Sequence, residues 1–175
     1  REMASGLSCP VGFKNGTDGN VKIAMDAIKS SMHSHIFLSP TMQGSTAIHQ
    51  TSGNEDAHLI LRGGKSPNYE AHYVKEYVET LGAQKLETGL VIDFSHANSR
   101  KQYERQLIVG KDVASQISRG DSRIMGVMIE SFLVEGRQAK SLTYGQSITD
   151  ACLSLTDTAL ALKLLASAVR KTARA

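Results

Sequence analysis

Five side chains able to bind anions or metal ions follow apolar runs of the sequence. Lys14, Arg62, His96 and Glu130 lie at or just beyond the ends of such runs, and Asp150 lies in the polar segment SITDAC. The interval from Arg62 to His96 and that from His96 to Glu130 are both 34 residues, whereas 48 residues separate Lys14 from Arg62. An interval of roughly 30 residues is typical of one βα unit of an eightfold barrel. In βα folds the catalytic and binding residues lie at the carboxyl ends of the strands, so we expect these side chains to face the same end of the barrel.

One imidazole and two carboxylates in this set suit a divalent metal ion. His96, Glu130 and Asp150 would supply the nitrogen and oxygen ligands that Mn²⁺, Fe²⁺, Co²⁺ or Zn²⁺ accept. Each residue also has a simpler interpretation: a capped strand end, a salt bridge and a helix N-terminal charge, respectively. Spacing alone leaves both interpretations open.

Lys14 and Arg62 are candidate anion-binding residues. Lys14 lies beside a flexible turn in GFKNGTDG, and two glycines follow Arg62 in RGGK. Glycines let backbone N–H groups approach an oxyanion closely, so a phosphate or carboxylate would suit this pair. The alternative is a surface turn with solvated charges.

Apolar runs at residues 7–13, 57–61, 90–94 and 124–129 predict the strands that position these side chains. The runs do not alternate polar with apolar residues, which is typical of parallel strands buried on both faces. Helical periodicity between the runs gives three apolar faces: Val21, Ala24, Met25 and Ile28; Val74, Tyr77, Val78 and Leu81; Tyr103, Leu107, Gly110, Val113 and Ile117. A last helix is predicted over 155–174, with one stripe formed by Leu155, Leu162, Leu165 and Val169.

Four strand-helix repeats make half of an eight-stranded barrel, and half a sheet leaves unpaired edges. We therefore expect residues 1–175 to be the C-terminal half of a single (β/α)8 TIM barrel, completed by an N-terminal half. The longer first interval holds an insertion at 35–56, where a turn centred on Gly44 predicts a β-hairpin. Periodicity does not decide whether HIFLS belongs to the hairpin or to the barrel.

The composition is that of one globular unit of 175 residues, 41% hydrophobic and 21% charged. A net charge of +3 without blocks of like charge favours a small anionic ligand, and we expect neither nucleic acid nor membrane as a partner. No apolar run approaches the roughly 20 residues of a membrane span. Cys9 and Cys152 have no metal-binding spacing, which favours a reducing cytoplasmic setting.

The chain resembles the C-terminal half of class I 3-deoxy-D-arabino-heptulosonate 7-phosphate (DAHP) synthase in five ordered motifs: GLSCPVGFKNGTDG, LRGGKSPNY, IDFSHAN, GVMIES and YGQSITDAC. This microbial family is regulated by aromatic amino acids. The resemblance implies a (β/α)8 transferase that condenses phosphoenolpyruvate with D-erythrose 4-phosphate and water to give DAHP and phosphate, the first step of the shikimate pathway to chorismate. It also implies a homo-oligomer, dimer or tetramer. The chain departs from the family between Gln138 and Leu142, where relatives generally carry a few more residues, so we expect a short loop there.

The resemblance also implies residue roles. By motif, His96, Glu130 and Asp150 would bind the metal, together with a cysteine of the N-terminal half that neither cysteine of this chain matches. Lys14 and Arg62 would bind phosphoenolpyruvate. Lys14, His96 and Asp150 would be the catalytic residues, and this half alone is expected to be inactive.

The hairpin at 35–56 resembles the element that helps to form the family's feedback-inhibitor site. Ser8, Phe37 and Ser39 fall near positions that would line this site for an aromatic amino acid, and LSP at 38–40 slightly favours tyrosine.

Two alternatives stand beside the interpretation of the chain as half of a DAHP synthase. One is an octulosonate-phosphate-synthase-like enzyme condensing phosphoenolpyruvate with another aldose, against which the hairpin and RGGKSPNY argue. The other is a non-catalytic half-barrel that acts as a binding or regulatory partner.

Overall fold

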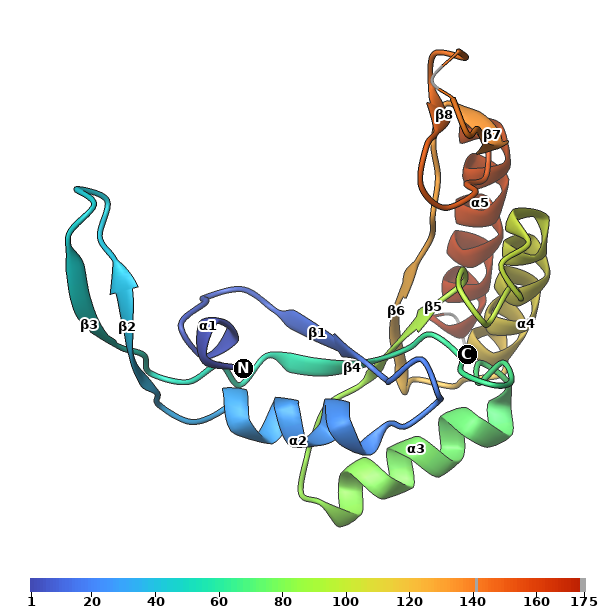
Figure 1. Cartoon of the computed structure of the whole chain (residues 1–175). Coiled ribbons are helices and arrows are strands. Elements are labelled where there is room, and N and C mark those ends of the chain that lie inside the picture. The colour runs from blue at the N-terminus through green and yellow to red at the C-terminus, as the bar shows by residue number, and fades with distance from the viewer. Residues whose placement is uncertain (141, 174–175) are drawn as a thin grey trace.

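A four-stranded parallel sheet forms the centre of the computed structural model, which describes residues 1–140 and 142–173 (Figure 1). Its strands occur in chain order, and they are β1 (Val11–Lys14), β4 (Ala57–Leu61), β5 (Leu90–Asp93) and β6 (Ile124–Met128). All three neighbouring pairs are parallel. The carboxyl ends of the strands therefore lie at one edge, and the predicted α/β architecture with a parallel sheet is confirmed.

A helix follows each of these strands along the chain. The helices are α2 (Lys22–Ser31), α3 (Ala71–Ala83), α4 (Gln106–Ser118, after the 3-10 turn Tyr103–Arg105) and α5 (Leu155–Thr172), with a short α1 (Glu2–Ser5) before the first strand. The predicted faces of α2, α3 and α4 enter the core, where Met25, Val74 and Val113 are buried. No helix in the described ranges is long and apolar enough to cross a membrane. The predicted helix end at Arg174 lies outside the described residues.

The expectation that all four strands are buried on both faces is wrong for the two outer ones. Every side chain of β5 except Val91 is buried, and β4 is similar, whereas β1 is half-buried along its length and β6 is buried only at Ile124. The reason is position, because β1 and β6 each have one neighbour in the sheet. Sequence runs of similar hydrophobicity do not reveal which strands lie at an edge.

The last predicted helix is present as α5, but contacts within this chain leave most of its apolar stripe exposed. Leu165 is buried together with Ala161 and Ala168, but the other members of the stripe are exposed over half of their surface: Leu155 60%, Leu162 53% and Val169 54%. α5 packs along α4 (Figure 1). Because α5 packs chiefly on one helix, it buries a narrow line that includes two alanines, and most of its leucines are exposed.

The predicted hairpin is present and consists of β2 (Ile36–Pro40) and β3 (Thr46–Gln50), paired antiparallel. Gly44 in its turn has φ +81°, a left-handed conformation that favours glycine. HIFLS therefore belongs mainly to the hairpin and not to the central sheet. The hairpin projects away from the four-stranded sheet (Figure 1).

The segment of the chain between β6 and α5 forms two short paired strands that were not predicted. β7 (Val134–Arg137) pairs with β8 (Gln146–Ser147), and isolated bridges join Ser131 to Leu153 and Gly136 to Cys152. This pairing fixes the two ends of the segment that carries Asp150. Residue 141, inside the loop expected to be short, lies outside the described residues.

Candidate metal and anion site

His96, Glu130 and Asp150 converge beyond the carboxyl edge of the sheet. Their ligand atoms all lie within 4.8 Å of one another. His96 Nε2 is 3.5 Å from Glu130 Oε1 and 3.9 Å from Asp150 Oδ2. Together with Ser95, Lys101 and Ala151 they line a cavity of about 40 Å³. One imidazole nitrogen and two carboxylate oxygens facing so small a space are a donor set that fits a divalent metal ion.

The backbone at His96 explains how its ring leaves the line of the strand. His96 has φ +54°, in the left-handed region that residues other than glycine seldom adopt. The turn is held by Lys101 N–H, which donates to His96 O at 2.8 Å, and by the Asn98 side chain, which donates to Asp93 O at 2.8 Å and to Leu61 O at 3.1 Å. These bonds maintain a strained conformation that turns the imidazole toward the carboxylates.

Glu130 is held at both its side chain and its backbone. Ser95 Oγ donates to Glu130 Oε2 at 2.8 Å. The fully buried amide of Gln106 donates to Glu130 O at 3.1 Å and accepts from Glu130 N–H at 3.0 Å. Gln106 was not among the predicted site residues, although it is a polar residue on the apolar face of the helix that follows the histidine motif.

Asp150 is the most exposed of the three residues, with 68% of its side chain accessible. Its segment is anchored beyond it, where Leu153 N–H donates to Glu130 O at 2.9 Å. Cys152 lies two residues along the chain, and burial raises the pKa of its thiol, which disfavours the thiolate needed for metal binding. Asp150 is thus accessible to solvent or ligand in a way that His96 and Glu130 are not.

Lys14 reaches the same region through a buried carboxylate that was not predicted as a site residue. Lys14 Nζ donates to Asp93 Oδ2 at 2.8 Å, and His96 Nδ1 lies 2.8 Å from the same oxygen. The imidazole is at hydrogen-bonding distance but is not aligned for a hydrogen bond. The signal in the sequence was a carboxylate that ends an otherwise apolar strand.

Three buried asparagines join the loops that follow β1, β4 and β5. Asn15 Oδ1 accepts from Arg62 N–H at 2.8 Å, and the Asn15 amide donates to Gly63 O at 2.9 Å. Asn68 Oδ1 accepts from Gly63 N–H at 2.7 Å, and Asn68 N–H donates to Asn98 Oδ1 at 2.8 Å. This network fixes the backbone of Arg62. Within residues 1–140 and 142–173 its guanidinium forms no ion pair, so its charge is available to an anion.

The residues predicted to bind an effector are only partly brought together. Phe37 and Ser39 line a hollow of about 470 Å³ at the base of the hairpin, and the Phe37 ring stacks on His49 with centroids 6.2 Å apart. Ser8 lines an adjacent hollow of about 300 Å³ instead. The two hollows share Gly6 and Ser52.

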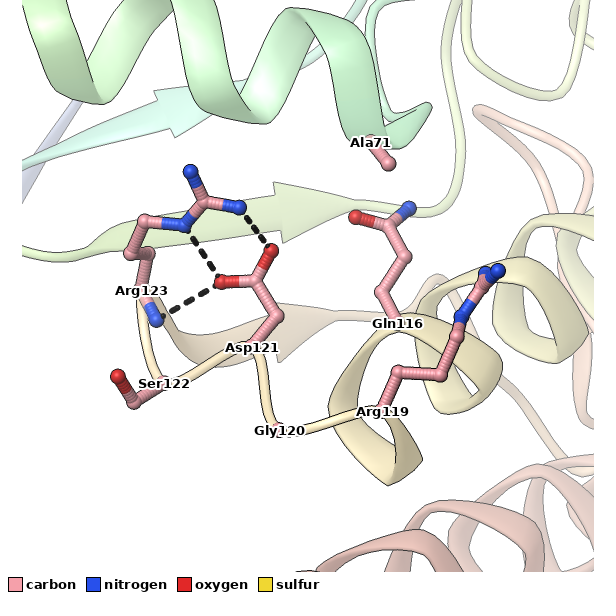
Figure 2. Close-up of a pocket in the computed structure, with 7 residues that line it drawn as sticks. All are labelled: Ala71, Gln116, Arg119, Gly120, Asp121, Ser122 and Arg123. Atoms are coloured by element: carbon pink, nitrogen blue, oxygen red, sulfur yellow. Dashed lines mark hydrogen bonds and ion pairs between the residues drawn. The ribbon is translucent and has the colours of Figure 1, made fainter.

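Another hollow, of about 480 Å³, lies between the end of α4 and the start of β6 (Figure 2). Arg123 Nε donates to Asp121 Oδ1 at 2.7 Å, and this pairing lowers the pKa of Asp121 and raises that of Arg123. The hollow contains none of the predicted site residues. It also lies at the amino end of β6, away from the edge at which βα folds carry their chemistry.

Comparisons with known proteins agree with the resemblance seen in the sequence. The sequence model of the DAHP synthetase I family matches residues 1–163. The chain is 55% identical over 174 residues to the Phe-sensitive phospho-2-dehydro-3-deoxyheptonate aldolase of Escherichia coli K12, covering 97% of this chain and 50% of that protein. It is 57% identical over 173 residues to the Trp-sensitive enzyme of Enterobacter agglomerans, with the same coverage.

A solved structure gives the same result in three dimensions. The phospho-2-dehydro-3-deoxyheptonate aldolase of Francisella tularensis SCHU S4 superposes with a TM-score of 0.94 at 46% identity, over 98% of this chain and 51% of that one. The chain therefore spans about half the length of the relatives that it matches.

Proposed function

The chain belongs to the DAHP synthetase I family, and we propose from that premise that it contributes the metal-binding half of a phospho-2-dehydro-3-deoxyheptonate aldolase. The substrates would be phosphoenolpyruvate and D-erythrose 4-phosphate, and the products DAHP and phosphate. The observation that carries this proposal is the convergence of His96, Glu130 and Asp150 on one small cavity, with Lys14 linked to His96 through Asp93.

We infer that residues 1–175 form the C-terminal half of a (β/α)8 barrel, with residues 35–56 as an inserted regulatory hairpin. β1 and β6 each have one sheet neighbour in the described structure, and α5 exposes most of its leucines. Four further strands would pair with both edges, and their helices would cover α5. Relatives of twice this length support the arrangement. The complete protein, below, means this chain together with that N-terminal half.

The three converging residues would hold Mn²⁺, Fe²⁺, Co²⁺ or Zn²⁺ through His96 Nε2, which faces both carboxylates. By the family resemblance, a cysteine of the N-terminal half would be the remaining protein ligand. When bound, such an ion supplies Lewis-acid polarisation of the aldehyde of erythrose 4-phosphate, which compensates for the weak nucleophilicity of carbon 3 of phosphoenolpyruvate.

Lys14 and Arg62 would bind the carboxylate and phosphate of phosphoenolpyruvate and hold its carbon 3 against the aldehyde carbon. Carbon 3 forms the new carbon–carbon bond, water adds to carbon 2, and phosphate leaves by C–O cleavage. The added water loses both protons as carbon 2 becomes a ketone: the aldehyde oxygen gains one, and the other leaves with the phosphate. Lys14, His96 and Asp150 are the titratable groups that we assign to these transfers.

The hollow at the base of the hairpin would bind an aromatic amino acid. Phe37 offers a stacking surface, and Ser39, with Ser8 in the adjacent hollow, offers hydroxyl groups. Relatives named as Phe-sensitive and Trp-sensitive support an aromatic effector. Tyrosine, which LSP slightly favours, is therefore to be tested beside phenylalanine and tryptophan.

We expect the complete protein to form a dimer or tetramer.

The decisive experiment is an assay of phosphoenolpyruvate consumption by the complete protein, with and without erythrose 4-phosphate and EDTA. Consumption should require the aldose phosphate and should stop with EDTA. The assay repeated with phenylalanine, tyrosine and tryptophan identifies the effector. A requirement for a five-carbon aldose phosphate would support the octulosonate-type alternative, and no turnover with any aldose would support a non-catalytic half.

The metal assignment is tested in the same assay with His96→Ala. Loss of an imidazole ligand should abolish turnover. His72 is exposed and lies outside the candidate site, so the control variant His72→Ala should retain turnover. Turnover of His96→Ala near that of the wild type, and still sensitive to EDTA, would show that the ligands lie elsewhere.

A further inference from the structure

One carboxylate oxygen lies between the anion-binding lysine and the metal-binding histidine. Asp93 Oδ2 is 2.8 Å from Lys14 Nζ and 2.8 Å from His96 Nδ1. We propose that Asp93 is a shared positioning residue, which sets the geometry of the phosphoenolpyruvate site and of the metal site together. The inference rests on the proposed function and extends it to a residue that touches neither substrate nor metal.

The Asp93 carboxylate is itself rigidly held. Its side chain is completely buried at the end of β5. Its other oxygen, Oδ1, accepts from Ser95 N–H at 2.9 Å, and its backbone carbonyl accepts from the Asn98 amide at 2.8 Å. With one oxygen and the backbone held in this way, the orientation of the carboxylate is restricted, and both basic groups lie 2.8 Å from its remaining oxygen.

Burial makes these contacts consequential for both partners. A carboxylate removed from water requires compensation by ion pairs or hydrogen bonds. Among the residues that the structure describes, Lys14 and His96 are the basic side chains at ion-pair distance from Asp93. The ion pair restricts an otherwise flexible lysine chain to one position near the site.

Asp93 also influences which nitrogen of the His96 ring carries the hydrogen. His96 Nδ1 lies at hydrogen-bonding distance from Asp93 Oδ2 without being aligned for a hydrogen bond, so the carboxylate acts through its charge. A negative charge this close favours the tautomer that carries its hydrogen on Nδ1 and leaves the Nε2 lone pair for an ion. Nε2 is the nitrogen that faces Glu130 and Asp150, at 3.5 and 3.9 Å. A change at Asp93 should therefore disturb the metal and the anion sites in one step.

The test compares Asp93→Asn with Asp121→Asn in the complete protein. Both aspartates form ion pairs and are little exposed, at 0% and 9% of their side chains, but Asp121 lies at the amino end of β6. Mn²⁺ affinity is measured by competition with a chelating dye in the absence of substrate. Phosphoenolpyruvate affinity is measured by calorimetry on metal-free protein.

Asp93→Asn should weaken Mn²⁺ binding by about 10- to 100-fold and should weaken phosphoenolpyruvate binding to the metal-free protein by about 10-fold. Asp121→Asn should leave both affinities within about twofold of the wild type. Unchanged affinities in folded Asp93→Asn, or a change in one affinity without the other, would overturn the shared role. Failure of the wild type to bind either ligand would refute the proposed function first.

A measurement on the wild type does not depend on the variant's folding. In the Zn²⁺-loaded complete protein, long-range ¹⁵N–¹H NMR reports which nitrogen of His96 carries hydrogen. The proposal requires hydrogen on Nδ1 and zinc on Nε2. The opposite arrangement would refute it, even if Asp93→Asn did not fold.

Discussion

Replacing Gln106 with leucine is expected to weaken the metal site through the backbone of Glu130. The Gln106 amide forms hydrogen bonds of 3.1 and 3.0 Å with the carbonyl and the N–H of that residue. Leucine has a similar volume but forms neither bond, so Glu130 N–H loses its partner and Glu130 O keeps only the bond from Leu153 N–H at 2.9 Å. Among the hydrogen bonds in the described structure, the one from Ser95 Oγ would still hold the carboxylate of Glu130, but the backbone that carries this carboxylate would be held less firmly.

The expected loss of stability follows from the burial of these groups. Leaving a buried backbone group unpaired costs about 1–3 kcal/mol. Glu130 is partly accessible, with 22% of its side chain exposed, so water can replace part of what is lost. We expect Gln106→Leu to lower the free energy of unfolding by about 1–2 kcal/mol, because one backbone group is left unpaired, and to weaken Mn²⁺ binding about 10-fold.

Gln116→Leu is a matched control on the same helix. Gln116 is also buried, at 2% exposure, and its amide donates to Tyr69 O at 2.9 Å, near the hollow of Figure 2 and away from the metal site. Urea unfolding should show that both variants are destabilised, whereas dye competition should show weaker Mn²⁺ binding in Gln106→Leu alone. Equal Mn²⁺ affinities in the two variants would refute the argument that Gln106 orients Glu130.

Two further predictions concern stability. Gly63 has φ +74°, and a Cβ there would lie 2.8 Å from Asn98 N, whereas Gly120 has φ +91° and open space around it. Thermal unfolding of the complete protein should therefore show a loss of about 3 kcal/mol or more for Gly63→Ala and about 1–2 kcal/mol for Gly120→Ala, and equal losses would contradict the predicted clash. Arg123 lowers the pKa of Asp121 in the folded protein. The pair therefore stabilises the fold fully at pH values above the ordinary pKa of an aspartate, and this stabilisation is lost as the pH falls through the lowered pKa of folded Asp121. Asp121→Asn should be less stable than the wild type at neutral pH, with a smaller difference at about pH 3; a difference independent of pH would show that the ion pair contributes nothing.

Strand positions and the convergence of His96, Glu130 and Asp150 were both accessible from the sequence. The four apolar runs coincide with β1, β4, β5 and β6 to within a few residues. The regular intervals that ended on His96 and Glu130 placed those side chains at one edge, because parallel strands of similar length share their carboxyl end. Asp150 could be added from its motif alone, since an irregular segment and not a strand delivers it.

Burial was predicted less well because it depends on neighbours. The leucines of α5 have helical spacing, but spacing does not show how many elements surround a helix. Within this chain α5 contacts chiefly α4, so Leu165 is buried while Leu155 and Leu162 remain exposed. The outer strands β1 and β6 differ from the prediction for the same reason.

The sequence by itself determined the residue types, their order and their spacing, and these were enough to indicate the family, the parallel α/β fold and the candidate ligands. Tertiary structure alone decided which polar groups support them. Hydrogen bonds of Asp93, Gln106 and the buried asparagines reach residues 24 to 79 positions away in the chain, and periodicity carries no information about such contacts. Their partners are set by how the loops beyond the strands fold over one another, because a buried polar group is stable only where that folding supplies its hydrogen bonds.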